Sequence, residues 1–336
     1  MQPMVLQDTP ALAIDNVTKT YTQWQRSGKA KDIIKNMFRP DKRVVTALDH
    51  VSLTINPGEF VAYAGANGAG KSTTIKILSG ILLPTQGRVS VLGMDPLRDR
   101  IPLMRRVGIL FGQRTELWWD HPVITSFEWK KEVWNIPDEI YQRNLKMVTQ
   151  LLDLTDILKT FARELSLGQR MRADIAMLLL HGPDLIFLDE PTLGLDVLAK
   201  QQMIHFLKKI NKEQKTTVVV TSHDMDDLEE MAQRVVLLNK GTIAFDGNFD
   251  ELRDALGGFY RIEITTSPKE APLSLPGMKL LRSEHGSHEY EFDRKIFPIH
   301  RVLGNLSEFP QILDVEIKKA PIEDVVANLY LSWKDK

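Results

Sequence analysis

One strand–loop–helix motif limits the folds open to this chain more than any other feature. The apolar run Val61–Ala64 leads into Gly65–Ser72, which has the spacing G-x-x-x-x-G-K-S. Its glycines allow backbone N–H groups to surround phosphate oxygens, and a helix beginning near Lys71 points its positive end at them. We expect Lys71 to reach the β- and γ-phosphates of a nucleotide and the Ser72 hydroxyl to hold Mg²⁺; the alternative is a flexible glycine loop. The predicted nucleotide contacts are Gly65, Ala66, Asn67, Gly68, Ala69, Gly70, Lys71, Ser72 and Thr73.

Two adjacent carboxylates follow a second apolar strand. Leu185–Leu188 runs directly into Asp189 and Glu190, and parallel sheets place their ligands at the carboxyl ends of their strands. We expect Asp189 to bind Mg²⁺, directly or through water, and Glu190 to polarise the water that attacks the phosphate. Alone, the pattern also fits a buried strand with a solvated acidic end, but the phosphate loop favours the catalytic interpretation.

Short β-rich runs alternate with helical stretches from about Ala11 to Gly247, which is typical of a parallel α/β domain. After Gly257-Gly258 the pattern restarts as a small α+β segment without recognisable ligand chemistry. We therefore predict a main domain over residues 1–257 and an accessory domain, for dimer contact or regulation, over 258–336. The strands expected in the main domain are Val61–Ala64, Val107–Phe111, Leu185–Leu188, Val218–Thr221 and the hairpin of Val235–Leu238 with Thr242–Phe245. In the accessory domain we expect strands at Tyr260–Thr265, Met278–Leu281, His288–Phe292 and Ile312–Ile317, and helices at Phe297–Leu306 and Ile322–Ser332.

The composition excludes several classes of site. The 336 residues include no cysteine, which rules out disulfides and thiolate chemistry. The formal net charge of −1 gives no general reason to expect nucleic-acid binding. The first residues lack the pattern of a signal peptide, and no apolar stretch approaches the roughly 20 residues of a spanning helix. We therefore expect that the chain does not cross a membrane by itself.

Three further motifs stand in a fixed order along the chain. Gln113 follows a predicted strand, Leu165–Gln169 opens a helix with Ser166 as its N-cap, and His223 follows another strand. In this arrangement residues 11–247 resemble the ABC ATPase family. The resemblance implies a P-loop NTPase fold of the α/β class with a helical signature subdomain over about residues 112–180, and an activity that hydrolyses ATP to ADP and phosphate.

The resemblance implies a role for each matching residue. Tyr21 corresponds to the aromatic residue that stacks on adenine, although a core aromatic is the alternative. Gln113 corresponds to the residue that contacts Mg²⁺ and the attacking water and senses the membrane partner. His223 corresponds to the switch histidine at the γ-phosphate, and Asp196 belongs to the loop Leu193–Asp196 that links two sites across a dimer. Taken alone, a glutamine or histidine of this kind is more often ordinary polar surface or a structural residue.

The signature motif implies a second subunit. Ser166, Gly168 and Gln169 match the signature that contacts the γ-phosphate bound on another subunit, while Leu167 replaces the family's usual first glycine and puts the fine geometry of the closed dimer in question. A signature that faces outward is useful only if another subunit supplies the nucleotide. We therefore expect a head-to-tail dimer, with a second copy or a paralogous ATPase subunit, that holds two ATP molecules at its interface.

Tryptophan is concentrated in one stretch of the chain. Trp118, Trp119, Trp129 and Trp134 follow Gln113 closely and are four of the six tryptophans. In the family this region forms the groove that receives a helix of the membrane subunit, and aromatic anchors are typical binding hot spots. The alternative is that these rings form the core of the helical subdomain.

A basic insertion interrupts the pattern over residues 22–43. Its apolar residues have helical spacing, as in a helix that lies on an anionic membrane surface. A solvated insertion that packs its apolar side on the parent domain is the alternative, and we favour it.

Four features together most resemble the ATPase subunits of bacterial ABC-2-type exporters, in the branch of viologen- and daunorubicin-type drug exporters: the insertion, Phe111–Arg114, Trp118–Asp120 and Leu165–Arg172. The resemblance implies a cytoplasmic motor subunit on the inner face of the cell membrane that binds ATP and Mg²⁺ and drives export through an integral ABC-2-type permease. The alternative is a soluble ABC ATPase that acts on nucleic acid or ribosomes. We expect no nucleic-acid partner, because the chain has one nucleotide module and no heptad insert.

Overall fold

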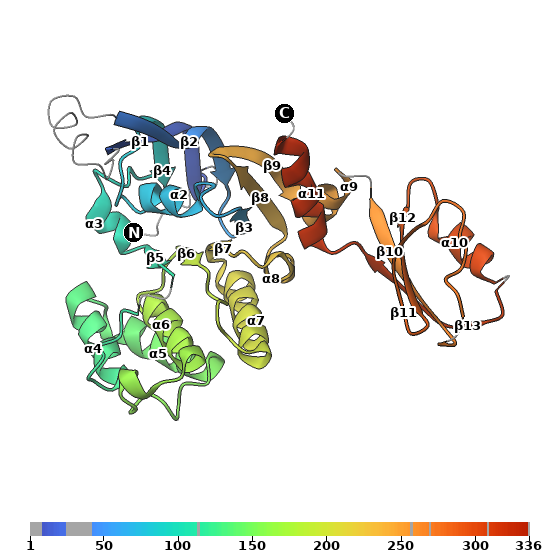
Figure 1. Ribbon diagram of the computed structural model, residues 1–336. Coiled ribbons are helices and arrows are strands. Elements are labelled where there is room, and N and C mark those ends of the chain that lie inside the picture. The colour runs from blue at the N-terminus through green and yellow to red at the C-terminus, as the bar shows by residue number, and fades with distance from the viewer. Residues whose placement is uncertain are drawn as a thin grey trace, which may run out of the picture. The chain divides into compact units, whose positions relative to one another are not determined.

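The computed structural model describes residues 9–24, 42–112, 115–255, 258–268, 270–307 and 309–334 (Figure 1). The contacts divide the chain into two compact units, Met1–Asp246 and Gly247–Lys336. This division lies earlier than the predicted one at 257/258. The reason is helix α9 (Phe249–Asp254), whose Asp250 accepts a hydrogen bond from Lys319 Nζ at 2.6 Å and so joins α9 to the second unit.

A largely parallel sheet forms the centre of the first unit, as the alternation of runs predicts. Its strands pair in the order β5-β6-β7-β3-β8-β9, and the pairs from β5 to β8 are parallel. Strands β3, β6 and β7 are buried along almost their whole length, as strands covered on both faces are. The strands predicted for this sheet are confirmed. They are β3 (Phe60–Gly65), β5 (Val107–Leu110), β6 (Leu185–Asp189), β7 (Thr217–Thr221), β8 (Arg234–Asn239) and β9 (Thr242–Asn248).

Helices connect the parallel strands, and some of them gather into a separate group. Helices α4, α5 and α6 lie together on the side of the unit away from β1 and β2 (Figure 1). They fall within the range predicted for the helical subdomain, about residues 112–180. The helices of the first unit are α2 (Lys71–Leu78), α3 (Arg100–Met104), α4 (Val123–Trp134), α5 (Asp138–Leu151), the 3₁₀ turn η1 (Ala162–Glu164), α6 (Leu167–Leu179), α7 (Val197–Gln214) and α8 (Met225–Met231).

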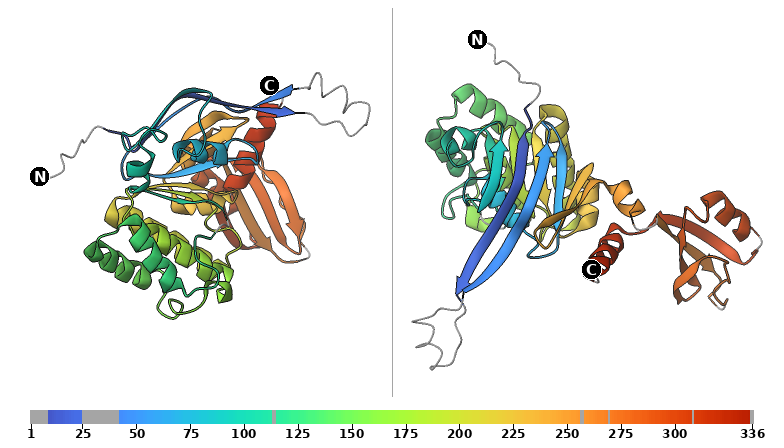
Figure 2. Two further views of the ribbon diagram at one scale, coloured as in Figure 1. Left: turned by 90° about the vertical axis from the view of Figure 1, so that its left-hand side faces the viewer. Right: turned by 90° about the horizontal axis from the view of Figure 1, so that it is seen from above.

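The first unit also contains an antiparallel sheet that the sequence did not predict. Strand β1 (Leu12–Trp24) pairs with β2 (Lys42–Ile55) on one side and with β4 (Gln86–Val91) on the other. Figure 2 shows β1 and β2 as one long hairpin. Because Thr22 pairs with Val44, the strands extend into the range 22–43 that was expected to be an insertion. The remainder of that insertion, with its proposed amphipathic helix, lies outside the described residues.

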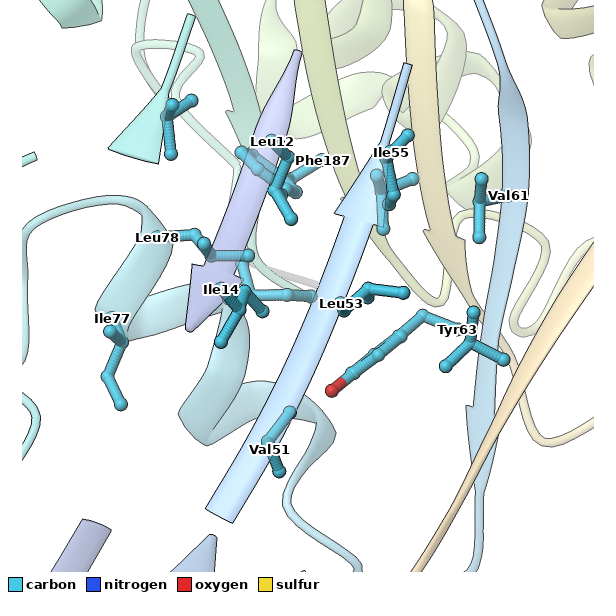
Figure 3. Packing of buried hydrophobic residues seen from close by; sticks show 14 of the residues in the cluster. Leu12, Ile14, Val51, Leu53, Ile55, Val61, Tyr63, Ile77, Leu78 and Phe187 are labelled. Atoms are coloured by element: carbon cyan, nitrogen blue, oxygen red, sulfur yellow. The ribbon is translucent and has the colours of Figure 1, made fainter. Parts of the chain in front are cut away.

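Apolar side chains from both sheets and from α2 form one core. Leu12 of β1 and Leu53 of β2 face Leu78 of α2 and Tyr63 of β3 (Figure 3). The Tyr63 hydroxyl shares a hydrogen bond of 3.0 Å with Thr74 Oγ1 on α2, and burial raises the pKa of Tyr63 above its usual value. This packing fixes α2 relative to β3, and with it the start of the helix.

The second unit is a small α+β fold. Its antiparallel sheet has the order β11-β12-β10-β13, and Ile262 on β10, Phe292 on β12 and Val302 on α10 contribute to its core. The elements are β10 (Phe259–Thr266), β11 (Lys279–Glu284), β12 (Ser287–Asp293), α10 (Ile299–Leu306), β13 (Ile312–Lys319) and α11 (Ile322–Lys334).

Candidate active site

The loop between β3 and α2 has glycine at positions whose backbone conformation disfavours other residues. Gly68 has a φ of 81°, and Gly70, the N-cap of α2, has a φ of 117°. A Cβ at Gly70 would lie 2.7 Å from the carbonyl oxygen of Ala47 on β2, whereas the space around Gly68 is open. The other predicted loop residues lie as follows: Gly65 ends β3, Ala66 accepts from the N–H of Ala69 at 3.0 Å, Asn67 is exposed, and Thr73 is half-buried in α2.

Lys71 reaches back across this loop. Its side chain is 8% exposed, and Nζ donates to the carbonyl oxygens of Gly65 at 2.5 Å and Ala66 at 3.3 Å. Burial lowers the pKa of Lys71 below its usual value, and the charges of Glu190 and Asp189 partly oppose this effect. The ammonium group therefore lies where the loop and both predicted carboxylates converge.

Asp189, at the end of β6, faces a hydroxyl group on each side. Ser72 Oγ donates to Oδ2 at 3.5 Å, and Thr221 Oγ1 donates to Oδ1 at 2.5 Å. A carboxylate and a hydroxyl beside a phosphate loop are the oxygen ligands that Mg²⁺ takes from proteins, so Ser72 and Asp189 fit that ion. The sequence reasoning missed Thr221. The feature that could have identified Thr221 is its position at the end of β7, opposite Asp189 in the parallel register.

Glu190 turns sharply out of the same strand. Its φ is 55°, and its N–H donates to the Thr221 carbonyl oxygen at 3.0 Å. Glu190 Oε1 lies 3.3 Å from Nδ1 of His223, which is more than half exposed. The structure therefore brings together the predicted catalytic pair of Glu190 and His223 beside Asp189 and Lys71.

The signature motif forms the start of α6. Ser166 is its N-cap in a capping box, in which the Ser166 N–H donates to Gln169 Oε1 at 2.9 Å and the Gln169 N–H donates to Ser166 Oγ at 3.3 Å. Leu167 is 37% exposed. A Cβ at Gly168 would meet Ala199 Cβ at an ordinary 3.5 Å, so the packing of this chain does not require glycine there.

Two further predicted site residues, Asp196 and Tyr21, lie on elements other than the phosphate loop. Asp196 is the N-cap of α7, and its carboxylate accepts from the Ala199 N–H at 2.8 Å. Tyr21 lies half-buried on β1, with Lys19 Nζ 5.3 Å from its ring centre. Gln113 lies outside the described residues.

The tryptophan stretch is largely exposed. Trp118, Trp119 and Trp129 are 36%, 49% and 41% exposed, whereas Trp134 is half-buried. The ring centres of Trp118 and Trp129 lie 5.0 Å apart, and the Arg170 guanidinium lies 4.7 Å from the Trp119 ring centre. The region therefore contains both packed rings and an exposed aromatic surface.

Comparisons with known proteins find similarity to ABC transporter proteins. A family model described as "ABC transporter" matches residues 48–193. The chain is 30% identical over 261 residues to the uncharacterized ABC transporter ATP-binding protein YhcH of Bacillus subtilis, a match that covers 76% of this chain and 81% of that protein. It is also 30% identical over 296 residues to ABC transporter A family member 1 of Dictyostelium discoideum, a match that covers 86% of this chain but only 33% of that protein.

An import protein and a solved dimer complete the comparison. The methionine import ATP-binding protein MetN of Carboxydothermus hydrogenoformans is 33% identical over 221 residues, covering 64% of this chain and 65% of that protein. Among solved structures, the dimeric post-hydrolysis state of the ATP-binding cassette MJ0796 bound to ADP and Pi matches with a TM-score of 0.58 and 26% identity. That match covers 70% of this chain and 98% of the other.

Proposed function

This chain belongs to the family of ABC transporter ATP-binding proteins, and we propose that it is the ATP-hydrolysing motor subunit of an exporter whose membrane-spanning part is a separate ABC-2-type permease. The observation that carries the ATPase activity is the convergence of Lys71, Asp189 and Glu190 at the carboxyl ends of β3 and β6. A phosphate loop with its lysine and two carboxylates in one place are the parts that phosphoryl transfer requires.

Each residue of the site has a separate role in ATP hydrolysis. The loop N–H groups and Lys71 bind the phosphates in positions set before the reaction begins. Glu190 orients the attacking water and accepts its proton. His223, 3.3 Å from that carboxylate, positions it and is exposed enough to contact the γ-phosphate.

Mg²⁺ fits the pair of Ser72 and Asp189, with Gln113 as a further ligand that the family resemblance implies. The metal would neutralise charge on the phosphate oxygens. Thr221 holds the Asp189 carboxylate through its other oxygen and so orients it toward Ser72.

A second ATPase subunit, either another copy of this chain or a paralogous one, completes the site in a head-to-tail dimer. Among the described residues, the hydrogen bonds of Ser166 stay within α6, and its side chain is exposed. The space around Gly168 does not demand glycine, which is the expected state of a residue that a ligand on another molecule must approach closely. The related cassette MJ0796, in its post-hydrolysis state with ADP and Pi, is itself dimeric.

The exposed surface of Trp118, Trp119 and Trp129 is our candidate for contact with the membrane subunit. Within the part of the chain that the structure describes, no helix has the length and apolar character to span a bilayer. In the proposed role as motor the subunit works with a membrane partner, and we place it on the cytoplasmic face of the membrane through that partner. The relatives include an import protein, so they do not decide the direction of transport. The proposal of export rests instead on the signature Leu165–Arg172 and the Trp118–Asp120 motif.

The test is purification of the full chain from gently solubilised membranes and, in parallel, from the soluble fraction. A co-purifying integral membrane protein that raises the ATPase rate when both are reconstituted supports the proposal. Recovery with RNA or ribosomes, lost after ribonuclease treatment, contradicts it and supports the alternative function.

The double variant Trp118→Ala with Trp119→Ala sharpens this test. It is expected to bind and hydrolyse ATP as a free subunit but to lose the stimulation by the membrane protein, because it removes the exposed rings. Phe259→Ala, which removes a similarly exposed ring on β10 of the second unit, is the matched control. Full stimulation of the tryptophan variant would exclude this surface as the docking site.

A further inference from the structure

Two side chains one turn apart on α6 bind the segment that follows Gln113. Asp174 is 7% exposed, and its Oδ1 accepts a hydrogen bond from Thr115 Oγ1 at 2.9 Å and another from the Glu116 N–H at 3.0 Å. Thr115 Oγ1 in turn accepts from the Leu117 N–H at 3.1 Å. The backbone of residues 115–117 is therefore held by a buried carboxylate of the signature helix rather than by regular secondary structure.

Arg170, which lies four residues before Asp174 on α6, contacts the same segment. Its guanidinium lies over the Trp119 ring, 4.7 Å from the ring centre, a cation–π arrangement that is stronger where water is excluded. Residues four apart on a helix share one face, and Arg170 is near enough to Asp174 to favour its ionised form. One face of α6, beginning directly after Gln169, thus holds the segment at both ends.

Helix α4 holds the other side of the segment. Lys130, almost fully buried, donates from Nζ to Glu116 Oε2 at 3.1 Å, and Ser126 Oγ accepts from the Trp118 N–H at 3.0 Å. The segment therefore lies bonded between α4 and α6, and it carries the exposed ring of Trp119 at its end.

We propose that Arg170 and Asp174 are positioning residues that hold segment 115–119 against the signature helix. Through them, binding of ATP at Ser166 is coupled to the exposed tryptophan surface. This inference rests on the proposed shared ATP site, because it needs a ligand that contacts Ser166. By reciprocity, contact at Trp119 changes the affinity of the signature for ATP by the same factor.

The chemistry of these two residues argues for this role over simple packing. An apolar residue at position 174 would fill the helix interface without the cost of burying a carboxylate, which raises the pKa of Asp174 to about 6. The same helix offers a contrast in Arg172, whose guanidinium donates to the Leu152 carbonyl oxygen at 2.9 Å and therefore faces the end of α5.

Amide hydrogen exchange on the full chain tests the proposal without the membrane partner. The parent protein carries Glu190→Gln, and the probe is ATP with MgCl₂. In the parent, ATP is expected to slow exchange in the first turn of α6 and at the amides of Glu116 and Leu117 by about fivefold or more, the lower end of typical coupling between sites. With Arg170→Gln and Asp174→Ala added, the α6 response should remain while the Glu116 and Leu117 response disappears.

Two further variants separate positioning from general damage. Asp174→Asn keeps an acceptor oxygen and is expected to retain the response of segment 115–119, and Arg172→Gln is expected to leave both responses intact. Should the double variant not fold, Thr115→Val with Trp119→Leu removes the opposite side chains of these contacts and leaves only the bond from the Glu116 N–H to Asp174, so it predicts a clearly weakened Glu116 and Leu117 response. An undiminished response would overturn the positioning role.

The outcomes distinguish this proposal from the proposed function. A Glu116 and Leu117 response that survives the loss of Arg170 and Asp174, or that is missing from the parent, overturns the positioning role while the shared site stands. A first turn of α6 that ignores ATP in the parent contradicts the shared site itself and the inference with it.

Discussion

Glu190 owes its position to its backbone as much as to its side chain. Its φ of 55° lies in the left-handed region, which is uncommon for residues other than glycine. The hydrogen bond from its N–H to the Thr221 carbonyl oxygen holds this turn and aims the carboxylate at His223. Such a conformation persists only where the surrounding structure enforces it, and it is concentrated at functional sites.

Glu190→Gln is expected to lower kcat for ATP hydrolysis by about 10²- to 10⁴-fold, the range for loss of a general base. ATP binding should persist, because the amide keeps the shape of the carboxylate. Steady-state phosphate release and equilibrium binding of ATP measure the two effects. Glu230→Gln, at an exposed position of α8, is the control and should leave kcat unchanged. Turnover at the parental rate would remove Glu190 from its assigned role.

Asp174 gives a prediction for the dependence of stability on pH. Burial raises its folded pKa to about 6, above the unfolded value near 4. An acid whose pKa rises on folding opposes folding once it is ionised, so the penalty is complete above pH 6 and fades as the pH falls toward 4. Asp174→Asn removes this penalty and keeps an acceptor oxygen.

We therefore expect Asp174→Asn to raise the melting temperature of the protein at pH 7.5 by a few degrees. The penalty removed is on the order of 3 kcal/mol before the hydrogen bonds readjust. At pH 5, about midway between the two pKa values, the gain should be about half as large. Thermal unfolding of both proteins at the two pH values provides the measurement, and an equal gain at both values would show that ionisation of Asp174 is not the cause.

At the scale of elements, the turn from β3 into α2 depends on Gly70 more than on Gly68. Gly70→Ala places a Cβ 2.7 Å from the Ala47 carbonyl oxygen and from Leu48 Cδ2, in addition to the strain of a φ of 117°. Gly68→Ala meets open space and carries only the strain of a left-handed residue, about 1–2 kcal/mol. We expect Gly70→Ala to abolish ATP binding and lower the melting temperature, and Gly68→Ala to weaken both properties only moderately. Calorimetric titration with ATP checks this order, and equal binding by the two variants would contradict it.

The elements that the sequence predicts well are those with local signals. Strand β3 and the phosphate loop follow from an apolar run and a glycine spacing, and β6 ends in two adjacent carboxylates. Strands β10, β12 and β13 of the second unit contain the β-branched and aromatic residues that are typical of strands. In each of these elements the signal lies within a few neighbouring residues.

The antiparallel sheet was missed because its first strand breaks the expected alternation. The pairing of β1 with β2 shifts register between Ile14 and Val17, again before Lys19, and once more before Thr20. Each bulge moves later side chains to the opposite face, so no continuous period of two remains. Contacts over long separations were also hidden, as between Asp174 and Thr115 or Asp189 and Thr221, because nothing near either residue specifies its partner.

In the molecule as a whole, the phosphate site and the signature motif lie on two separate parts of the first unit. Lys71, Asp189 and Glu190 converge at the ends of the parallel strands, while Ser166 begins a helix in the α4–α6 group and, among the residues that the structure describes, has its hydrogen bonds within that helix. If one copy supplies the phosphate loop and another supplies the signature, each ATP holds two subunits together. Loss of the γ-phosphate then removes the shared ligand, an order-to-open change of the kind that nucleotide switches use.

Mixing two inactive variants tests this claim most directly. Lys71→Ala destroys the phosphate loop and Ser166→Ala destroys the signature, so each variant alone should hydrolyse ATP only at background rate. In a mixed dimer one of the two sites combines the intact loop of one copy with the intact signature of the other. The account predicts that the mixture hydrolyses ATP well above the sum of the separate variants, whereas a mixture that stays at that sum would contradict it.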